Sequence, residues 1–337
     1  MENELADRLQ RYLAGRYPGA QVTEFQFLAS GYESDVYTFV FHAPQDSSRP
    51  LILRVYPGDH VNTKLLREAN GLGLLQKAGF PVAAMVCFET DPGILGNPFT
   101  VMEKLTGKGL WALLDQVPPV QADHLLDRFG SLMAQLHRLD WRPFTPQPDR
   151  YEANPTLLLE EDLAGSRQWF QRFGVPGFEQ VTDWLEAHKS EITVQLAVVH
   201  LDFNASNVFL CDDDRLVVID WTQVTVHDYR ADLSWTLMIM GDFGQPHWKE
   251  RILQAYRQEA GHPIESLGYF NVIADTKILA STIISSQTSP AALGLNPGKG
   301  EAPEQQATTI RRLYQRIKQT TGVTIPEVEA ALSDLIN

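Results

Sequence analysis

The order of strand-like and helix-like segments is the feature that most constrains the fold of this chain. From about residue 21 to residue 104, short apolar and aromatic runs alternate with turn residues. A helical apolar pattern at 62–78 follows the third run, so the segments are ordered β-β-β-α-β-β. This order predicts an antiparallel sheet with one helix. A further helix is expected before the sheet, because Leu5, Leu9 and Leu13 recur every four residues.

The remainder of the chain, from Gly107 onward, has mainly helical patterns. Two short strands, 208–210 and 216–219, flank a turn that contains three adjacent aspartates, which favour solvated turns. Helices are expected at 121–138, 156–173, 177–190, 231–240, 247–259, 268–287, 303–320 and 326–336.

The length of 337 residues is typical of two domains or lobes. We therefore predict an α+β fold with a small antiparallel-sheet lobe at 1–104 and a larger, mostly helical lobe at 105–337. The segment 289–303 is rich in proline and glycine and is expected to form a long loop.

Charge and cysteine content exclude several classes of protein. The chain has 42 acidic and 28 basic residues, a net charge of −14, which argues against a nucleic-acid partner. Two cysteines, Cys87 and Cys211, support neither a disulfide framework nor a four-cysteine metal site. No apolar run approaches the roughly 20 residues of a membrane span, and the acidic start does not match a signal peptide. We expect a cytoplasmic protein without a membrane partner, and the oligomeric state stays open.

Residues 198–221 contain the groups that phosphoryl transfer requires. Asp202 is followed by Asn207 and then by Asp220 after the two short strands. In phosphoryl transfer one carboxylate accepts the proton of the attacking hydroxyl, while an amide and a second carboxylate hold Mg²⁺. Magnesium prefers such oxygen ligands. A hairpin between the loop and the last aspartate can bring the three side chains to one point.

This stretch resembles the aminoglycoside phosphotransferase and choline kinase-like superfamily, whose members share the two-lobed protein-kinase-like fold. Their loop is usually His-Gly-Asp-x-x-x-x-Asn, followed by Ile-Asp-Trp or Ile-Asp-Phe. Here residues 200–207 match except that Leu201 replaces the glycine, and 219–221 read Ile-Asp-Trp. The resemblance extends over about 27–235 and is most specific over 198–235.

The resemblance implies roles for individual residues in the helical lobe. Asp202 would be the catalytic base, and Asn207 and Asp220 would bind Mg²⁺. His200 follows three apolar residues and is interpreted as a packed, hydrogen-bonded scaffold residue. Asp232 matches the family aspartate that opens a buried helix, so a helix-capping or loop-bracing role is expected.

The resemblance also implies a nucleotide site in the lobe 1–104. Arg54 occupies the strand position whose basic residue meets the α- and β-phosphates, and Glu68 would pair with it from the helix. The cofactors would be Mg²⁺ and ATP, with GTP possible. Further contacts are expected from a glycine-poor phosphate loop and from the backbone of the hinge that would hold the purine, namely Ser30, Gly31, Ser34, Glu103 and Leu105.

A second motif, Asp-Phe-Gly at 242–244, resembles the metal signature of protein kinases. It lies 35 residues after Asn207 and follows a helical pattern, so it is interpreted as a helix-ending turn. The gap between Asp220 and Asp232 is also too short for an activation loop. A small-molecule hydroxyl is therefore the expected acceptor, rather than a protein.

The sequence suggests three classes of function. The leading one is an ATP-dependent, or GTP-dependent, phosphotransferase with an aminoglycoside-like acceptor; choline, homoserine, methylthioribose and macrolide acceptors stay open. A cationic acceptor would need carboxylates or aromatic rings, for which Asp242, Glu265, Trp235 and Trp248 are candidates. A nucleotide-binding protein without turnover would have lost one of the three motif residues. A metal hydrolase using His200, Asp202 and His227 would need a second, closely spaced histidine, and the sequence has none.

Overall fold

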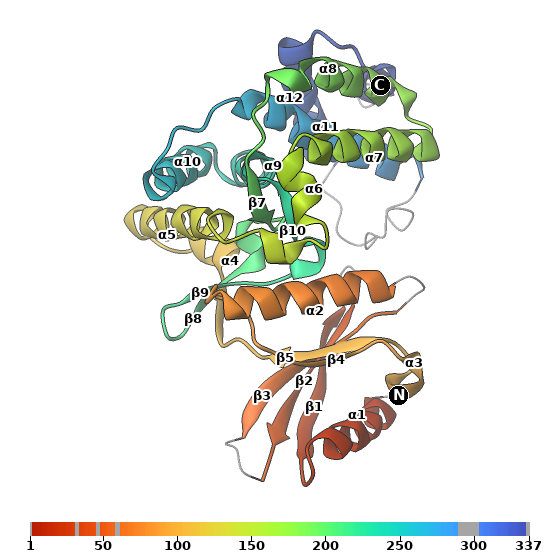
Figure 1. Ribbon diagram of the computed structural model, residues 1–337, viewed down its shortest axis with the longest axis vertical. Coiled ribbons are helices and arrows are strands. Elements are labelled where there is room, and N and C mark those ends of the chain that lie inside the picture. The colour runs from red at the N-terminus through yellow and green to blue at the C-terminus, as the bar shows by residue number, and fades with distance from the viewer. Residues whose placement is uncertain (1, 31–33, 45–47, 58–60, 289–302, 335–337) are drawn as a thin grey trace. The chain divides into compact units, whose positions relative to one another are not determined.

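The computed structural model describes residues 2–30, 34–44, 48–57, 61–288 and 303–334 (Figure 1). Gly31 and most of the expected loop at 289–303 lie outside these residues. The chain forms two compact units, neither of which is continuous in sequence. The first unit comprises Met1–Ala112 and Ser206–Val224, and the second comprises Leu113–Ala205 and Thr225–Asn337.

The first unit is built on a five-stranded antiparallel sheet with the strand order β1-β2-β3-β5-β4. The predicted order β-β-β-α-β-β is confirmed, and a short helix is inserted between the last two strands. The elements are α1 (Glu2–Arg16), β1 (Gln21–Ser30), β2 (Asp35–His42), β3 (Arg49–Val55), α2 (Val61–Lys77), β4 (Met85–Glu89), α3 (Pro92–Leu95) and β5 (Phe99–Glu103).

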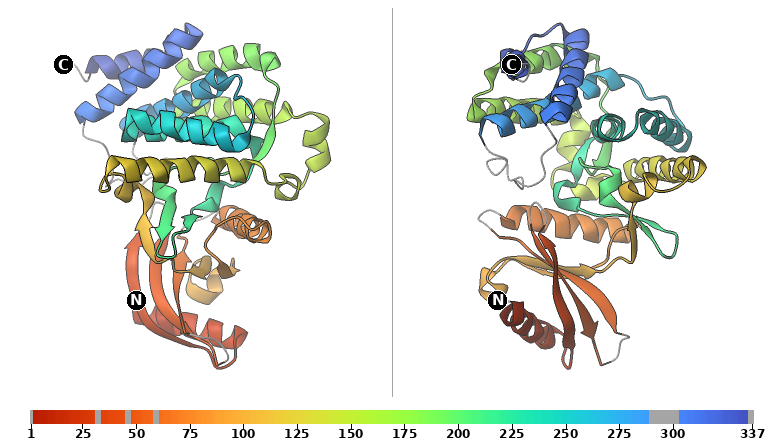
Figure 2. Two further views of the ribbon diagram at one scale, coloured as in Figure 1. Left: turned by 90° about the vertical axis from the view of Figure 1, so that its left-hand side faces the viewer. Right: turned by 180° about the vertical axis from the view of Figure 1, so that it is seen from behind.

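Strand β3 shows how the alternation of side chains gives the sheet two different faces. Leu51 and Leu53 are buried in a cluster that also contains Leu9 and Leu13 of α1. Figure 2 shows α1 lying against the sheet. Arg54 has the opposite orientation and contacts α2 through Glu68. The sheet therefore has one face for the core and one face available for a site.

A second, three-stranded sheet joins the segment after residue 206 to the first unit. Its strands are β6 (Gly107–Gly109), β8 (Val208–Cys211) and β9 (Leu216–Val218), in the order β6-β8-β9. Gly107 is required here, because a Cβ at this position would lie 2.2 Å from the Leu210 carbonyl oxygen. The hairpin turn between β8 and β9 is solvated, and Asp213 in it pairs with Arg215 at 2.7 Å. The hairpin, expected with the helical lobe, thus packs in the sheet-containing unit.

The second unit is mostly helical, and the helices that the sequence predicted begin and end within three residues of their predicted positions. They are α5 (Pro119–His137), α7 (Leu157–Phe173), α8 (Glu179–His188), α9 (Tyr229–Met238), α10 (Pro246–Ala260), α11 (Leu267–Gln287), α12 (Pro303–Thr321) and α13 (Pro326–Asp334). The sequence did not predict α4 (Leu110–Leu114), α6 (Pro148–Ala153), or the paired strands β7 (Leu196–Val199) and β10 (Thr225–Asp228). These elements are too short to show a clear period.

The Asp-Phe-Gly sequence lies in a π-helical turn, Ile239–Gly244, that continues α9. This confirms its interpretation as a helix-ending turn. Asp242 pairs there with Arg316 at 2.6 Å and with Arg312 at 3.2 Å, so two guanidinium groups already compensate its charge.

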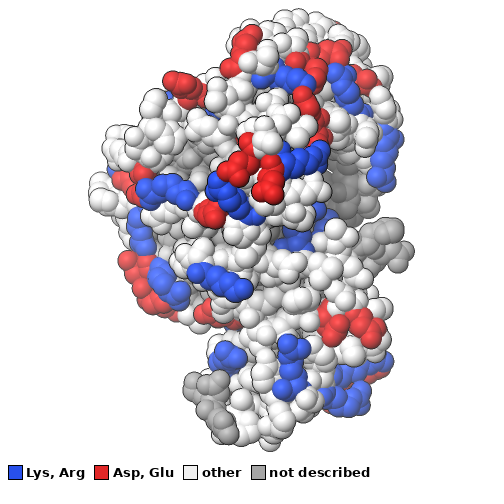
Figure 3. Space-filling model, in the orientation of Figure 1, with Lys and Arg blue, Asp and Glu red and all other residues white. Residues whose placement is uncertain are grey.

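Across the described part of the chain, no helix has the length and apolar character needed to cross a membrane. Acidic and basic side chains are interspersed on the face drawn in Figure 3. Many of them form exposed ion pairs, such as Arg150 with Glu161 at 2.6 Å.

Candidate active site

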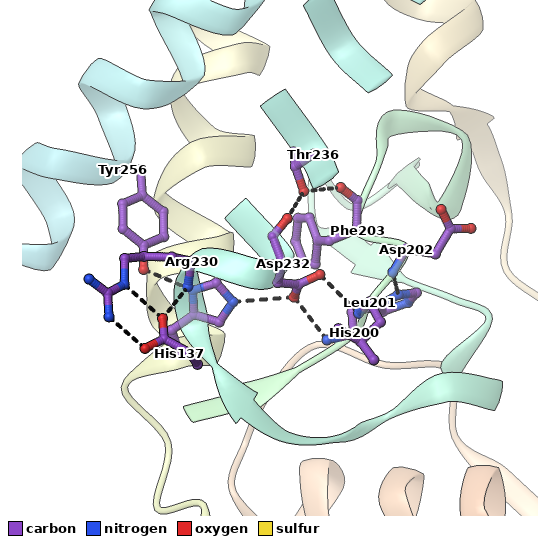
Figure 4. Close-up of polar contacts among 10 residues, drawn as sticks. His137, His200, Leu201, Asp202, Phe203, Arg230, Asp232, Thr236 and Tyr256 are labelled. Atoms are coloured by element: carbon purple, nitrogen blue, oxygen red, sulfur yellow. Dashed lines mark hydrogen bonds and ion pairs between the residues drawn. The ribbon is translucent and has the colours of Figure 1, made fainter. Parts of the chain in front are cut away.

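A buried carboxylate holds the backbone of the loop that follows β7. Asp232 of α9 is fully buried, and its two carboxylate oxygens accept hydrogen bonds from the backbone N–H groups of His200 (2.8 Å) and Leu201 (2.9 Å). Figure 4 shows this carboxylate directed at the loop. The cap of α9 is instead Asp228, whose side chain accepts from the N–H of Arg230. Of the two roles expected for Asp232, the structure therefore supports loop bracing.

Asp232 also contacts a histidine of α5, which in turn contacts a tyrosine of α10. His137 Nε2 of α5 lies 3.2 Å from Asp232 Oδ2, and His137 Nδ1 lies 2.8 Å from the hydroxyl of Tyr256 in α10 (Figure 4). Burial alone would raise the pKa of Asp232, but the hydrogen bond and the charge interactions with His137 and His200 hold the pKa below its ordinary value. The carboxylate that braces the loop therefore stays ionised at neutral pH.

Leu201 has a left-handed backbone conformation, with φ of 63°. Glycine adopts this conformation without penalty, whereas other residues lose roughly 1–2 kcal/mol in it. The family motif usually has glycine at this position, and the left-handed backbone explains why glycine is favoured there. The N–H of Leu201 donates to Asp232, so this hydrogen bond stabilises the strained turn.

Asp202 is oriented by two donors in the second unit. Its Oδ1 accepts hydrogen bonds from the side-chain amide of Asn204 and from the indole N–H of Trp235, both at 2.9 Å. Its backbone N–H donates to His200 Nδ1 at 3.2 Å. His200 is fully buried, which confirms its interpretation as a packed scaffold residue. The carboxylate of Asp202 is thus held in one orientation.

The first unit contains a cavity of about 410 Å³ between its sheet, α2 and the residues after β9. Its walls are mostly apolar, and its polar side is formed by Ser34, Arg54, Glu68 and Asp220. The complete lining is Leu28, Ser34, Val36, Ile52, Arg54, Glu68, Leu72, Ala83, Met102, Glu103, Lys104, Leu105, Phe209, Val218, Ile219, Asp220 and Trp221.

Arg54 is the centre of the polar side of this cavity. Its guanidinium lies 2.6 Å from Glu68 Oε1, 3.3 Å from the Ser34 hydroxyl and 3.9 Å from Asp220 Oδ1. The predicted pair of Arg54 and Glu68 is therefore present. Burial would lower the pKa of Arg54, but the charges of Glu68 and Asp220 raise it overall, so the guanidinium is permanently charged.

Tyr56 is a member of this network that sequence reasoning missed. Its hydroxyl donates to Glu68 Oε2 at 2.8 Å, and Glu68 is 1% exposed. Both carboxylate oxygens of Glu68 are therefore occupied, one by Arg54 and one by Tyr56. A signal was available, since residues two apart in an extended segment point to the same face.

Asp220 is the second residue after β9 and has a left-handed backbone, with φ of 64°. Its Oδ1 accepts from the Thr222 hydroxyl at 3.1 Å, and its side chain is 45% exposed.

The N–H of Ile219 donates to the backbone oxygen of Asn207 at 2.9 Å. This bond ties together the segments that carry the two predicted metal ligands, Asn207 and Asp220. An amide and a partly exposed carboxylate fit Mg²⁺, which usually takes few protein oxygens and completes its shell with phosphates and water. Among the described residues, no group of three or more His, Cys, Asp or Glu could hold a metal by itself.

The structure brings together most of the residues predicted for the nucleotide site. Ser34, Arg54, Glu68, Glu103 and Leu105 line one cavity, together with Asp220. The remaining predicted residues lie elsewhere: Ser30 is not in the described lining and donates its hydroxyl to Asp35, Asn207 precedes β8, and Asp202 belongs to the second unit.

Of the candidate residues for a cationic acceptor, Asp242, Trp235 and Trp248 are engaged or buried, whereas Glu265 is exposed. Asp242 pairs with two arginines, Trp248 is 2% exposed, and Trp235 donates to Asp202. The backbone oxygen of Glu265 accepts from Arg230 at 2.9 Å.

The fold and these residues define a chain of the phosphotransferase class. The sequence matches the Phosphotransferase enzyme family over residues 24–266, and the chain belongs to that family. A Ralstonia eutropha protein assigned as an aminoglycoside phosphotransferase has a similar structure, with a TM-score of 0.65, 18% identity and coverage of 97% of this chain and 98% of that one. The ADP-bound aminoglycoside phosphotransferase APH(2'')-Ib has a TM-score of 0.57, 16% identity and coverage of 94% and 99%. The kinase-like α+β fold and the predicted resemblance are thereby confirmed.

The curated proteins with similar sequences are named as acyl-CoA dehydrogenases. Acyl-CoA dehydrogenase family member 11 of Gallus gallus is 27% identical over 177 residues, which cover 51% of this chain and 22% of that protein. The chain spans between 22% and 30% of the length of the curated relatives that it matches.

Proposed function

We propose that this protein transfers the γ-phosphate of ATP to a hydroxyl group of a small molecule. The observation that supports this most is the position of Arg54. It contacts Glu68 and Ser34 and lies near Asp220 on the polar side of a mostly apolar cavity. A purine suits the apolar walls, and a guanidinium can bind phosphate oxygens with two hydrogen bonds.

Within this proposal, the residues of the first unit bind the nucleotide. The backbone at 103–105 would hydrogen-bond the purine, and Arg54, positioned by Glu68, would hold the phosphates. The same backbone contacts could take a guanine, so GTP is a second nucleotide to test. Asn207 and Asp220 would hold Mg²⁺, which neutralises charge on the phosphate oxygens when bound.

Asp202 would act as the general base. Its carboxylate would accept the proton of the acceptor hydroxyl while Trp235 and Asn204 keep it oriented. Positions 202 and 207 are five residues apart, so the chain between the base and the first proposed metal ligand is at most roughly 18 Å long.

The acceptor class is the open part of the proposal. Aminoglycosides are the acceptors suggested by the names of the solved structures, and acyl-CoA compounds are suggested by the names of the curated relatives. Both belong in an acceptor screen, together with choline, homoserine, methylthioribose and macrolides.

A thermal-shift titration with Mg·ATP and Mg·GTP tests the nucleotide site. Nucleotide at 100 times Kd should add about 2.7 kcal/mol of stability, and Asp220→Ala should abolish the magnesium-dependent part. Asp213→Ala, in the solvated turn of the same unit, serves as the control and should respond like the wild type. A folded wild-type protein with no response to either nucleotide would contradict the proposal.

A further inference from the structure

Half-buried apolar side chains continue from α9 into the π-helical turn. Trp235, Ile239 and Phe243 pack with Ile278 of α11 against a small buried cluster formed by Met238, Ala274 and Leu313. We call the four half-buried residues the apolar wall: Trp235, Ile239, Phe243 and Ile278. All four belong to the second unit.

The apolar wall begins at the proposed catalytic base. The indole N–H of Trp235 donates to Asp202 Oδ1 at 2.9 Å, so one residue contributes both to the wall and to the orientation of the carboxylate. An acceptor whose hydroxyl is close to Asp202 would therefore contact the ring of Trp235. The side chains that follow it in the same cluster are aliphatic or aromatic.

Two acidic residues beside this wall are already compensated by arginines. Asp242 pairs with Arg312 and Arg316, and Asp275 accepts from Arg316 Nε at 2.8 Å. Two carboxylates are thus matched by two guanidinium groups. A polycationic acceptor would have to displace these arginines before it gained an ion pair with Asp242 or Asp275, and the desolvated charges left behind would be costly.

We propose that the acceptor carries its hydroxyl on an apolar carbon chain, which lies along the wall formed by Trp235, Ile239, Phe243 and Ile278. This inference rests on the proposed phosphotransferase function and names its substrate class. In the transfer, the hydroxyl oxygen bonds to the γ-phosphorus and gives its proton to Asp202. The bond between the γ-phosphorus and the bridging oxygen breaks, and ADP leaves with that electron pair.

The test compares linear primary alcohols from 1-propanol to 1-hexanol with kanamycin and choline, using ADP release as the readout. Each methylene that contacts the wall should raise kcat/KM about threefold to fourfold. Higher kcat/KM for the cationic acceptors, or a flat dependence on chain length, would overturn the inference.

Two substitutions distinguish the two roles proposed for the apolar wall, namely contact with the carbon chain of the acceptor and orientation of Asp202. Ile239→Ser should raise KM for 1-hexanol, flatten the chain-length dependence and leave kcat near the wild-type value. Trp235→Phe keeps an aromatic ring but removes the donor to Asp202, so it should lower kcat about tenfold with a smaller change in KM. The matched controls are Ile264→Ser, at a half-buried isoleucine outside the wall, and Trp184→Phe, whose ring stacks on His188.

The thermal-shift titration on the same samples distinguishes the two possible failures. If Mg·ATP gives no shift and no acceptor releases ADP, the proposed function itself is wrong. If Mg·ATP binds and alcohols show no turnover, or if Ile239→Ser behaves like Ile264→Ser, the nucleotide site stands and the apolar acceptor is excluded.

Discussion

Buried polar residues in this protein differ in whether they have partners, and this difference decides what each one does. Asp232 accepts two backbone N–H groups and contacts His137. His227 of β10 is also buried, but neither ring nitrogen has a hydrogen-bonding side-chain or backbone partner of acceptable geometry. Burial lowers the pKa of His227 below its ordinary value of 6.5, and the charge of Asp162 offsets this only in part. Asp232 thus organises a loop, whereas His227 makes the stability of the protein sensitive to pH.

The lowered pKa of His227 predicts how stability changes with pH. The unfolded chain binds a proton at this residue near pH 6.5, and the folded protein binds it only at lower pH. The stability associated with neutral His227 is therefore complete above the unfolded pKa and is lost as pH falls toward the folded pKa. His227→Phe should flatten the decrease in the free energy of unfolding between about pH 7 and pH 5, measured by urea denaturation.

The control for this prediction is His247→Phe, at an exposed position. It should reproduce the pH dependence of the wild type. If His227→Phe and His247→Phe give the same slope, the buried histidine does not contribute to the pH dependence.

Helix α2 is positioned by a close approach to the segment after Asp220. A Cβ built on Gly71 would lie 2.4 Å from Val224 Cγ1, whereas a Cβ on Gly73, in the same helix, would meet nothing within 4 Å. The 3₁₀ turn at Trp221–Gln223 packs on α2 here. Because Glu68 lies on α2 and Asp220 precedes the turn, this contact connects two polar residues of the cavity.

Substitution by alanine should therefore have opposite effects on protein stability at Gly71 and at Gly73. Gly73→Ala should stabilise the protein by about 0.5–1 kcal/mol, because alanine is the better helix former. Gly71→Ala should destabilise it by roughly 1–3 kcal/mol through overpacking, and Val224→Ala in that background should recover part of the loss. Chemical denaturation measures all three. Equal effects of the two glycine substitutions would mean that α2 does not approach Val224 this closely.

At the scale of the whole molecule, the proposed functions are divided between the two units. All residues that line the cavity belong to the first unit, and Asp202 and Trp235 belong to the second. The chain passes between the units at residues 112–113, 205–206 and 224–225. Nucleotide affinity and turnover should therefore respond to different residues.

Asp202→Asn tests this division. Asparagine keeps an oxygen that can accept from Trp235 and Asn204, but it cannot accept a proton as a general base. Turnover should fall about 10²-fold or more, while the Kd for Mg·ATP, measured by calorimetry, should stay within about twofold of the wild type. A parallel loss of nucleotide affinity would show that Asp202 contributes to the nucleotide site.

Much of this architecture could be read from local sequence patterns. The strand order of the first unit follows from alternation and turn residues, and the pair of Arg54 and Glu68 follows from a strand and a helix that are adjacent in sequence. The motif residues Asp202, Asn207 and Asp220 are close in sequence as well. Local patterns also distinguished the Asp-Phe-Gly turn from a metal site, because helical periodicity precedes it.

Other contacts had no local signal. His137 contacts Tyr256 and Asp232 across 119 and 95 residues, and Trp235 reaches Asp202 across 33. Asp242 also acquires its role only through partners from another element.

The sequence by itself determined which segments are strands and helices, and which short motif could support phosphoryl transfer, because both depend on the period and spacing of nearby residues. Only the tertiary structure decided that Asp232 braces the loop, that Arg312 and Arg316 compensate Asp242, and that Trp235, a member of an apolar cluster, contacts Asp202. The physical reason is that the partners of a buried charge or an exposed apolar side chain are set by packing between distant elements, which no local pattern encodes.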